Sequence, residues 1–312
     1  MDGLILAFSV VFPLFAFMVV GYVLRRVKKI DPPTVGKLNQ LVFQLCLPLV
    51  VFLSIYNSDF EQDFSPKLIT TVLCLSLITF ALCMVIIPRI EPSNPKRASM
   101  IQGIYRSNFV LFGIPVAQAV YGDEAVSITA VAIAVVVPII NALSVFALEW
   151  YSDRGCDFKR IGKSMLKHPI IIAALSGLAV KLIGLTIPVL ITDVMSDLSA
   201  MATPLALLAL GASLRMEQLK GSWKQMVFCA VARLIACPLL YISVGIFLGF
   251  RGIELIPIFC LAASPTAVSS TAMAQMMGAD YELAGQIVAA TSLGAILTIF
   301  LWISVLENLH FI

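Results

Sequence analysis

Long apolar segments separated by short polar connections follow one another along the whole chain. Each is about 20 residues long, the length that lets an α-helix cross the hydrocarbon core of a bilayer. The pattern predicts ten transmembrane helices, over residues 4–25, 37–57, 67–88, 99–121, 124–150, 168–185, 195–215, 224–249, 254–278 and 281–306. We therefore expect an all-α polytopic membrane protein in which no connection is long enough to fold as a soluble domain.

Composition supports this interpretation and excludes several classes of protein. Hydrophobic residues make up 60% of the chain and charged residues 12%, against about 25% charged residues in soluble domains. The seven cysteines form no CxxC pair, and the two histidines lie near helix ends. We therefore expect no disulfide framework, metal site or cofactor, and no nucleic-acid partner.

The basic residues gather on alternate connections. On one side lie Arg25, Arg26, Lys28, Lys29, Lys37, Arg89, Lys96, Arg97, Arg106, Arg154, Lys159, Arg160, Lys163, Lys167, Arg215, Lys220 and Lys224. The other side holds Lys67, Lys181 and Arg251, while Arg233 falls within a span. Because loops rich in Lys and Arg stay in the cytoplasm, we predict a multi-pass protein of the cell (plasma or inner) membrane, surrounded by lipid, with both termini outside.

The two halves of the chain resemble each other at an offset of 156 residues, half of the total of 312. This offset aligns Pro13 with Pro169, Gly21 with Gly177, Pro32 with Pro188, Pro48 with Pro204, and Gly122 with Gly278. Five helices per half is an odd number, so the halves insert in opposite orientations. We therefore predict two inverted five-helix repeats, 1–156 and 157–312, which is an arrangement typical of transporters.

Polar residues and prolines interrupt two corresponding helices. "RSNFVLFGIP" (106–115) lies in the fourth helix, and the same offset pairs it with "AASPTAVSST" (262–271) in the ninth. Backbone groups freed by a helix break need a partner or a water-lined cavity, and paired interruptions mark the central site of many transporters. The candidate substrate-binding residues here are Asn108, Gly113, Pro115, Ser264, Pro265, Thr266, Ser269 and Ser270.

The chemistry of these two runs favours an anion. They offer neutral hydrogen-bonding groups and half-helix N-termini, and neither contains Asp or Glu. We therefore expect a small organic anion, in particular a carboxylate. The alternative is that the prolines only kink packing helices and that the hydroxyls bond back to their own helices.

Three further features have two interpretations each. The second helix is broken by Pro48, and its Gln44 and Ser54 are either pathway residues or part of a kinked packing helix. Arg106 either steers anions or anchors the fourth helix. Arg233 contacts substrate, snorkels to the inner surface, or pairs with a helix C-terminus.

Several segments together resemble the bacterial branch of the auxin efflux carrier family. They are "LNQLVFQLCLPLVVF", "QGIYRSNFVLFGIPVAQAVYGDEA", "ATPLALLALGASL", "RLIACP" and "SPTAVSSTAMAQMMGADYELA", which extend over nearly the whole chain. The resemblance implies a scaffold of helices 1, 2, 6 and 7 and a transport part of helices 3–5 and 8–10. It also implies an elevator-type carrier, a homodimer, and broken crossover helices 4 and 9 that cross beside the substrate. Plant members export the carboxylate auxin, and some bacterial members are associated with malate or malonate.

The sequence therefore predicts a secondary transporter that moves small carboxylates by alternating access around a site at the membrane midplane. A ligand-binding sensor without transport and an anion channel are the competing functions. An enzyme is not expected, because the chain holds no HExxH motif and no Ser/His pair typical of a catalytic site.

Overall fold

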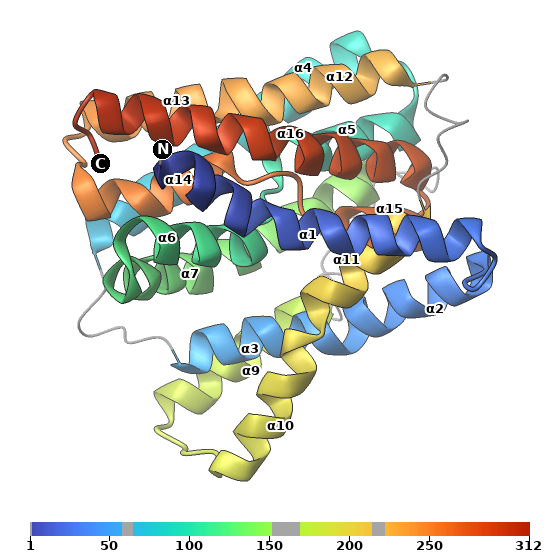
Figure 1. Ribbon diagram of the computed structural model, residues 1–312, viewed down its shortest axis with the longest axis horizontal. Coiled ribbons are helices and arrows are strands. Elements are labelled where there is room, and N and C mark those ends of the chain that lie inside the picture. The colour runs from blue at the N-terminus through green and yellow to red at the C-terminus, as the bar shows by residue number, and fades with distance from the viewer. Residues whose placement is uncertain (1, 58–64, 152–168, 214–221) are drawn as a thin grey trace.

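The computed structural model describes residues 2–57, 65–151, 169–213 and 222–312, and these ranges are almost entirely helical (Figure 1). The first half holds α1 (Asp2–Arg26), α2 (Pro32–Leu41), η1 (Val42–Cys46), α3 (Leu47–Asn57), α4 (Pro66–Ile90), α5 (Asn94–Tyr105), η2 (Phe109–Gly113), α6 (Ile114–Tyr121) and α7 (Asp123–Trp150). The second half holds α9 (Pro169–Leu182), α10 (Val189–Ala200), α11 (Ala202–Ser213), α12 (Trp223–Val231), η4 (Ala232–Ala236), α13 (Cys237–Phe247), η5 (Gly252–Leu255), α14 (Ile256–Ala263), α15 (Ser269–Met277) and α16 (Tyr281–Asn308).

Each of the ten predicted ranges contains helix, and several helices are long and apolar enough to span a membrane. Among the described residues, five continuous helices meet both requirements, or six if α16, bent by 42°, counts as one span. The protein is therefore an all-helical, multi-pass membrane protein. Of the remaining ranges, 4–25 is covered by the 25-residue α1 and the other three by shorter helices, so the full set of ten spans stays a prediction.

The helices divide into two groups by their packing. One group contains the closely packed pairs α1 with α11 and α3 with α9, joined by α2 and α10. The other group, α4–α7 with α12–α16, shares one large hydrophobic core, to which α3 contributes Val51 and Ile55. In Figure 1 the α9–α10 pair extends below the rest of the bundle. The two groups also touch each other, through α3 and α9 on α7 and through α1 on α16.

Two glycines allow α1 and α11 to pack with their backbones in contact. A Cβ atom added at Gly21 would lie 2.0 Å from the Leu208 carbonyl oxygen, and one added at Gly211 would lie 1.9 Å from the Met18 carbonyl oxygen. Small residues permit this approach between membrane helices, where dispersion contacts hold helices together. The α1–α11 contact therefore depends on glycine from both sides.

Three prolines are each preceded by a π-helical turn. The turns η1, η2 and η4 end two residues before Pro48, Pro115 and Pro238, respectively. A proline inside a helix clashes with the carbonyl four residues earlier and gives it no hydrogen. A wider turn relieves that clash and leaves a carbonyl free for another donor. At each of these prolines the helix therefore continues, with one widened turn before the proline.

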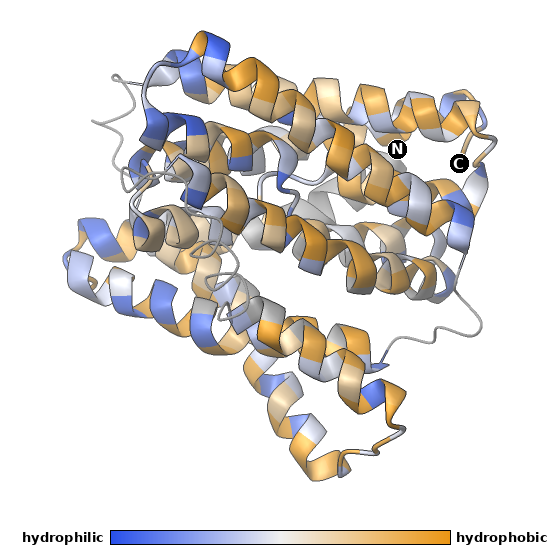
Figure 2. Ribbon diagram, turned by 180° about the vertical axis from the view of Figure 1, so that it is seen from behind, coloured by the Kyte–Doolittle hydropathy of each residue, from blue (hydrophilic) through white to orange (hydrophobic). Residues whose placement is uncertain are grey.

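Hydrophilic residues gather at the end of the bundle that lies opposite the two termini (Figure 2). The described basic residues of that predicted cytoplasmic side include Arg25, Arg26, Arg89, Lys96, Arg97 and Lys224. The predicted cytoplasmic residues Arg154, Lys159, Arg160, Lys163, Lys167, Arg215 and Lys220 lie outside the described residues. At the other end, Lys67, Lys181 and Arg251 each donate to backbone carbonyls.

Candidate functional site

The interrupted fourth and ninth helices cross each other where their helical structure stops. The chain leaves the helix after Tyr105, re-enters it at Phe109, and is non-helical again from Ser264 to Val268. The Asn108 N–H donates to the Pro265 carbonyl over 2.8 Å, and the Ala267 N–H donates to the Arg106 carbonyl over 3.0 Å. The two unwound segments thus form one short antiparallel bridge within the helical bundle.

The two breaks have different causes. Pro265 disfavours helical geometry in the preceding residue, and Ser264 is extended at φ −62° and ψ 143°. The first segment has no proline at its break, and Arg106 is extended at φ −85° and ψ 98° because its backbone pairs with the second segment. Pro115, which the sequence suggested as the helix breaker, lies within α6 instead.

A double-cysteine variant tests this crossing. Ser107 and Thr266 face each other as a pair flanked by the two bridging hydrogen bonds, a type of pair with Cα atoms about 4.5 Å apart. That separation suits a disulfide. We expect Ser107→Cys/Thr266→Cys, in a background without the native cysteines, to crosslink on mild oxidation, as measured by a thiol-labelling mass shift. Absence of the crosslink in folded protein would contradict the crossing.

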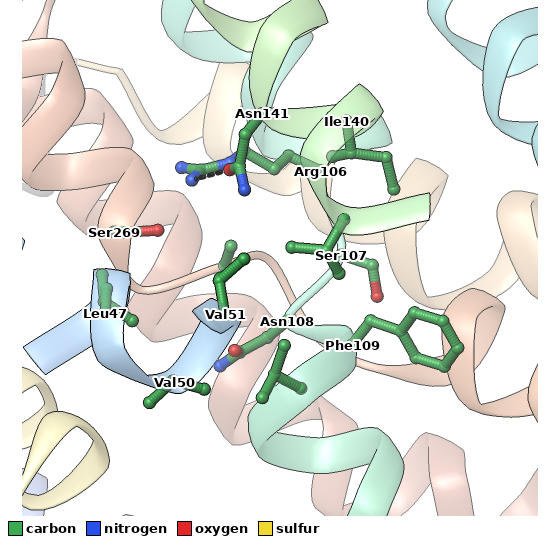
Figure 3. Close-up of a pocket in the computed structure, with 13 residues that line it drawn as sticks. Leu47, Val50, Val51, Arg106, Ser107, Asn108, Phe109, Ile140, Asn141 and Ser269 are labelled. Carbon is green, nitrogen blue, oxygen red and sulfur yellow. Dashed lines mark hydrogen bonds between the residues drawn. The ribbon is translucent and has the colours of Figure 1, made fainter. Parts of the chain in front are cut away.

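A pocket lies between this crossing and α3 (Figure 3). Its volume is about 50 Å³, which holds a group of a few heavy atoms. Its lining residues are Leu47, Val50, Val51, Arg106, Ser107, Asn108, Phe109, Val110, Val137, Ile140, Asn141, Ala267 and Ser269. No acidic residue is among them, so the pocket combines an apolar wall with hydrogen-bond donors and one cation.

The amide of Asn108 is buried without a hydrogen-bond acceptor. Asn108 is 5% exposed, and its Nδ2 has no partner, nor has the hydroxyl of Ser107 beside it. Figure 3 shows the amide directed to the side on which α3 lies. An unpaired buried donor costs about 1–3 kcal/mol, so this group is suited to an acceptor supplied by a ligand.

Arg106 places a buried cation in the same pocket. Its side chain is 2% exposed and donates to the Ser270 hydroxyl over 3.1 Å and to Asn141 Oδ1 over 2.6 Å. Both partners are neutral, and no acidic residue in the described part of the chain contacts the guanidinium. Its positive charge is therefore held by dipoles alone, and this favours an anion nearby.

Several other predicted site residues do not line the pocket. The Ser264 hydroxyl donates to the Cys260 carbonyl of its own helix, which agrees with the alternative in which such hydroxyls bond back to their helices. The Thr266 hydroxyl instead donates to the Gly103 carbonyl of α5, across the crossing. Gly113 is buried against Phe109. Gln44 is exposed, with its amide carbonyl bonded by Gln40, and it does not line the pocket. The side chains of Ser54 and Pro115 lie outside the described residues.

Asn141 of α7 and the apolar wall that α3 forms were not among the predicted site residues. An amide in the middle of the run "VVVPIINALSVF" is a signal that could have identified Asn141, because polar residues inside spans are functional candidates. The wall residues Leu47, Val50 and Val51 carry no such signal. Among the described residues, no group of three His, Cys, Asp or Glu side chains could hold a metal ion.

Arg233 lies behind the crossing and not in the pocket lining. Its Nε donates to the Ser264 carbonyl over 2.8 Å, its Nη1 to the Ile104 carbonyl over 3.1 Å, and its Nη2 to the Leu261 carbonyl. All three carbonyls lie at the C-terminal ends of α5 and α14. Of the interpretations open from sequence, pairing with helix C-termini is the one observed.

Comparison with known proteins agrees with this architecture. The family described as "Membrane transport protein" matches residues 6–154 and 158–303. An "Uncharacterized transporter" of Methanothermobacter thermautotrophicus is 23% identical over 291 residues, covering 93% of this chain and 95% of that protein. A "Putative malonate transporter" of Rhizobium meliloti is 24% identical over 302 residues, covering 93% of each.

A plant relative matches over a shorter range. "Auxin efflux carrier component 8" of Arabidopsis thaliana is 28% identical over 128 residues, which cover 38% of this chain and 34% of that protein. The matched family and these relatives are transporters and not enzymes. The chain belongs to the membrane transport proteins of the auxin efflux carrier family.

Proposed function

We propose that the protein is a secondary transporter of small carboxylates, with malonate as the first substrate to test. The observation that carries this proposal is the buried amide nitrogen of Asn108, which has no hydrogen-bond partner and lies in a pocket without acidic residues. A carboxylate oxygen is the acceptor that this donor lacks. The name of the Rhizobium meliloti relative supports the choice of malonate.

The pocket suits the two parts of a small organic acid. Arg106 supplies a positive charge and Asn108 a directed donor, while Leu47, Val50 and Val51 offer an apolar surface to the carbon skeleton. The Arg106 guanidinium already binds Ser270 and Asn141. Some of its N–H groups are therefore already used, and Arg106 attracts the anion by its charge without binding it through all of its donors. This favours release as well as binding.

Alternating access is proposed from the packing of the two helix groups. The ligand would be held by the crossing segments and would move with them past α3 and the rest of the scaffold, as in an elevator-type carrier. The scaffold consists of α1, α2–α3, α9 and α10–α11, and the moving part consists of α4–α7 and α12–α16. A homodimer with both termini outside completes this proposal.

The glycine contacts support an inverted repeat within the scaffold. A Cβ at Gly21 of α1 would meet the carbonyl of Leu208 in α11, and a Cβ at Gly177 of α9 would meet the carbonyl of Phe52 in α3 at 3.0 Å. The 156-residue offset carries Gly21 to Gly177 and Phe52 to Leu208. The same close approach of a glycine to a carbonyl thus occurs twice, once with the glycine in the first half and once with the glycine in the second half. This exchange is expected for inverted repeats.

Flux measurements separate the carrier from its alternatives. Purified protein in proteoliposomes should take up labelled malonate saturably, and unlabelled malonate, malate or auxin should compete. Malonamide, of similar size but neutral, should not compete. Binding without uptake would indicate a sensor instead, and a conductance that does not saturate would indicate a channel.

The proposed orientation predicts a labelling pattern. Asn94 begins α5 at the strongly charged end, and Thr186 lies in the connection between α9 and α10; both are exposed. In cells, Asn94→Cys should react with an impermeant maleimide only after the membrane is opened, and Thr186→Cys should react from outside. The reverse pattern would overturn the assignment of both termini to the outside.

A further inference from the structure

The two buried arginines near the crossing occupy different environments. Arg106 lines the pocket, whereas Arg233 does not. Arg233 is 1% exposed, and its three guanidinium nitrogens each donate to a backbone carbonyl. Its role is therefore not explained by contact with a ligand in the pocket.

The carbonyls that Arg233 binds belong to two helix ends. Ile104 is in the last turn of α5, Leu261 is in the last turn of α14, and Ser264 directly follows α14. The last carbonyls of a helix lack intrahelical donors and carry the negative end of the helix dipole. Bringing two such ends together within the membrane is unfavourable without a cation between them, and the planar guanidinium binds both at once.

A hydrogen bond from α16 fixes the segment that carries Arg233. Arg233 lies in the widened turn η4, which ends two residues before Pro238. The Leu234 carbonyl, four residues before Pro238, cannot receive a hydrogen bond from that proline. Trp302 Nε1 of α16 donates to it over 3.1 Å, so the turn is held in the geometry that directs Arg233 to the two helix ends.

We propose that Arg233 is the positioning residue that holds the two broken helices in their crossed form. Its guanidinium takes the place in which other transporters with unwound helices bind a metal cation through carbonyls and half-helix C-termini. The crossing is then assembled without sodium at this position. The consequence for substrate binding rests on the proposed carboxylate function, but the assembly of the crossing does not.

The assembly is tested without any ligand, by the crosslink between Ser107→Cys and Thr266→Cys. Adding Arg233→Ala should slow crosslinking about tenfold or more, because three carbonyls lose the guanidinium and the Ile104 carbonyl keeps only the weak thiol donor of Cys237. Millimolar guanidinium chloride, far below unfolding concentrations, should restore much of the rate. Arg251→Ala is the matched control, because Arg251 also donates to carbonyls, of Ile246 and Phe250, but away from the crossing.

The outcomes of this arm are distinct. Guanidinium rescue of Arg233→Ala but not of Arg251→Ala would support the proposal. An unchanged crosslinking rate in Arg233→Ala, or a slowed rate that guanidinium does not restore in folded protein, would overturn it. If Arg233→Ala does not fold, Arg233→Lys replaces it: a single nitrogen reaches fewer of the carbonyls, so slower crosslinking is expected and an unchanged rate would overturn the proposal.

The second arm measures malonate affinity by calorimetry. Wild-type affinity should agree within about twofold in sodium, potassium and choline buffers, and a strict sodium requirement would count against a resident cation at this position. Arg233→Ala should bind malonate about tenfold more weakly and regain affinity with guanidinium. If the wild type binds no carboxylate, the proposed function fails, while the crosslinking arm still decides the role of Arg233.

Discussion

Asn108→Asp should abolish malonate binding in calorimetry, and Asn108→Ala should weaken it by about 1–3 kcal/mol, or about 5- to 150-fold. The alanine variant removes the donor that has no protein partner and leaves the remaining pocket intact. The aspartate variant has nearly the same shape but places a negative charge against an anion. That charge would also pair with Arg106 in the same pocket and so compete with the ligand.

The matched control for this series is Asn308→Asp. Asn308 lies at the exposed end of α16, where its amide donates to the Ser304 carbonyl over 2.8 Å. This variant makes the same chemical change far along the chain from the crossing and should bind malonate as the wild type does. Folded Asn108 variants that both keep wild-type affinity would remove the crossing from the binding site.

Gly211→Ala should cause one of the two largest losses of stability among the glycine variants, about 3 kcal/mol or more, the upper end for overpacking. The added Cβ would lie 1.9 Å from the Met18 carbonyl oxygen and 2.6 Å from its carbonyl carbon. Both atoms belong to the α1 backbone, so a change of side-chain rotamer cannot relieve the clash. The two helices must separate, and they lose the close packing that holds them together.

Thermal unfolding in detergent measures this loss of stability, and three other glycine variants provide the comparison. Gly21→Ala meets the Leu208 oxygen at 2.0 Å and should match Gly211→Ala, whereas Gly177→Ala, at 3.0 Å from the Phe52 oxygen, should cost less. Gly36 in α2 has no atom within 4 Å of an added Cβ, so Gly36→Ala should be neutral or slightly stabilising. Equal melting temperatures for Gly211→Ala and Gly36→Ala would contradict the described α1–α11 contact.

Much of the fold could be predicted because each membrane helix satisfies its own backbone within one continuous segment. Apolar runs of spanning length therefore located helices in all ten ranges without any knowledge of their partners. The break after Ala263 was also local, because Pro265 restricts the residue before it. The family could likewise be recognised from segments distributed over the chain.

The details of the candidate site could be predicted less well. Asn108, Arg106 and Ser269 were found as polar residues inside apolar runs, and all three line the pocket. Gln44 has the same polar signal but does not reach the pocket. A polar residue in a span indicates that some partner exists, yet the direction of its side chain depends on the neighbouring helices.

By itself, the sequence determined the helices, the two polar interruptions, the excess of charge on one side and the family. Only the tertiary structure decided that the first break lies at Arg106–Asn108, because that backbone is extended through hydrogen bonds with Pro265 and Ala267. The same holds for the contact of Arg106 with Asn141 and for the three carbonyls that Arg233 binds. Each of these interactions joins groups from different helices, and hydrogen bonding across such separations depends on three-dimensional packing, which no local sequence pattern records.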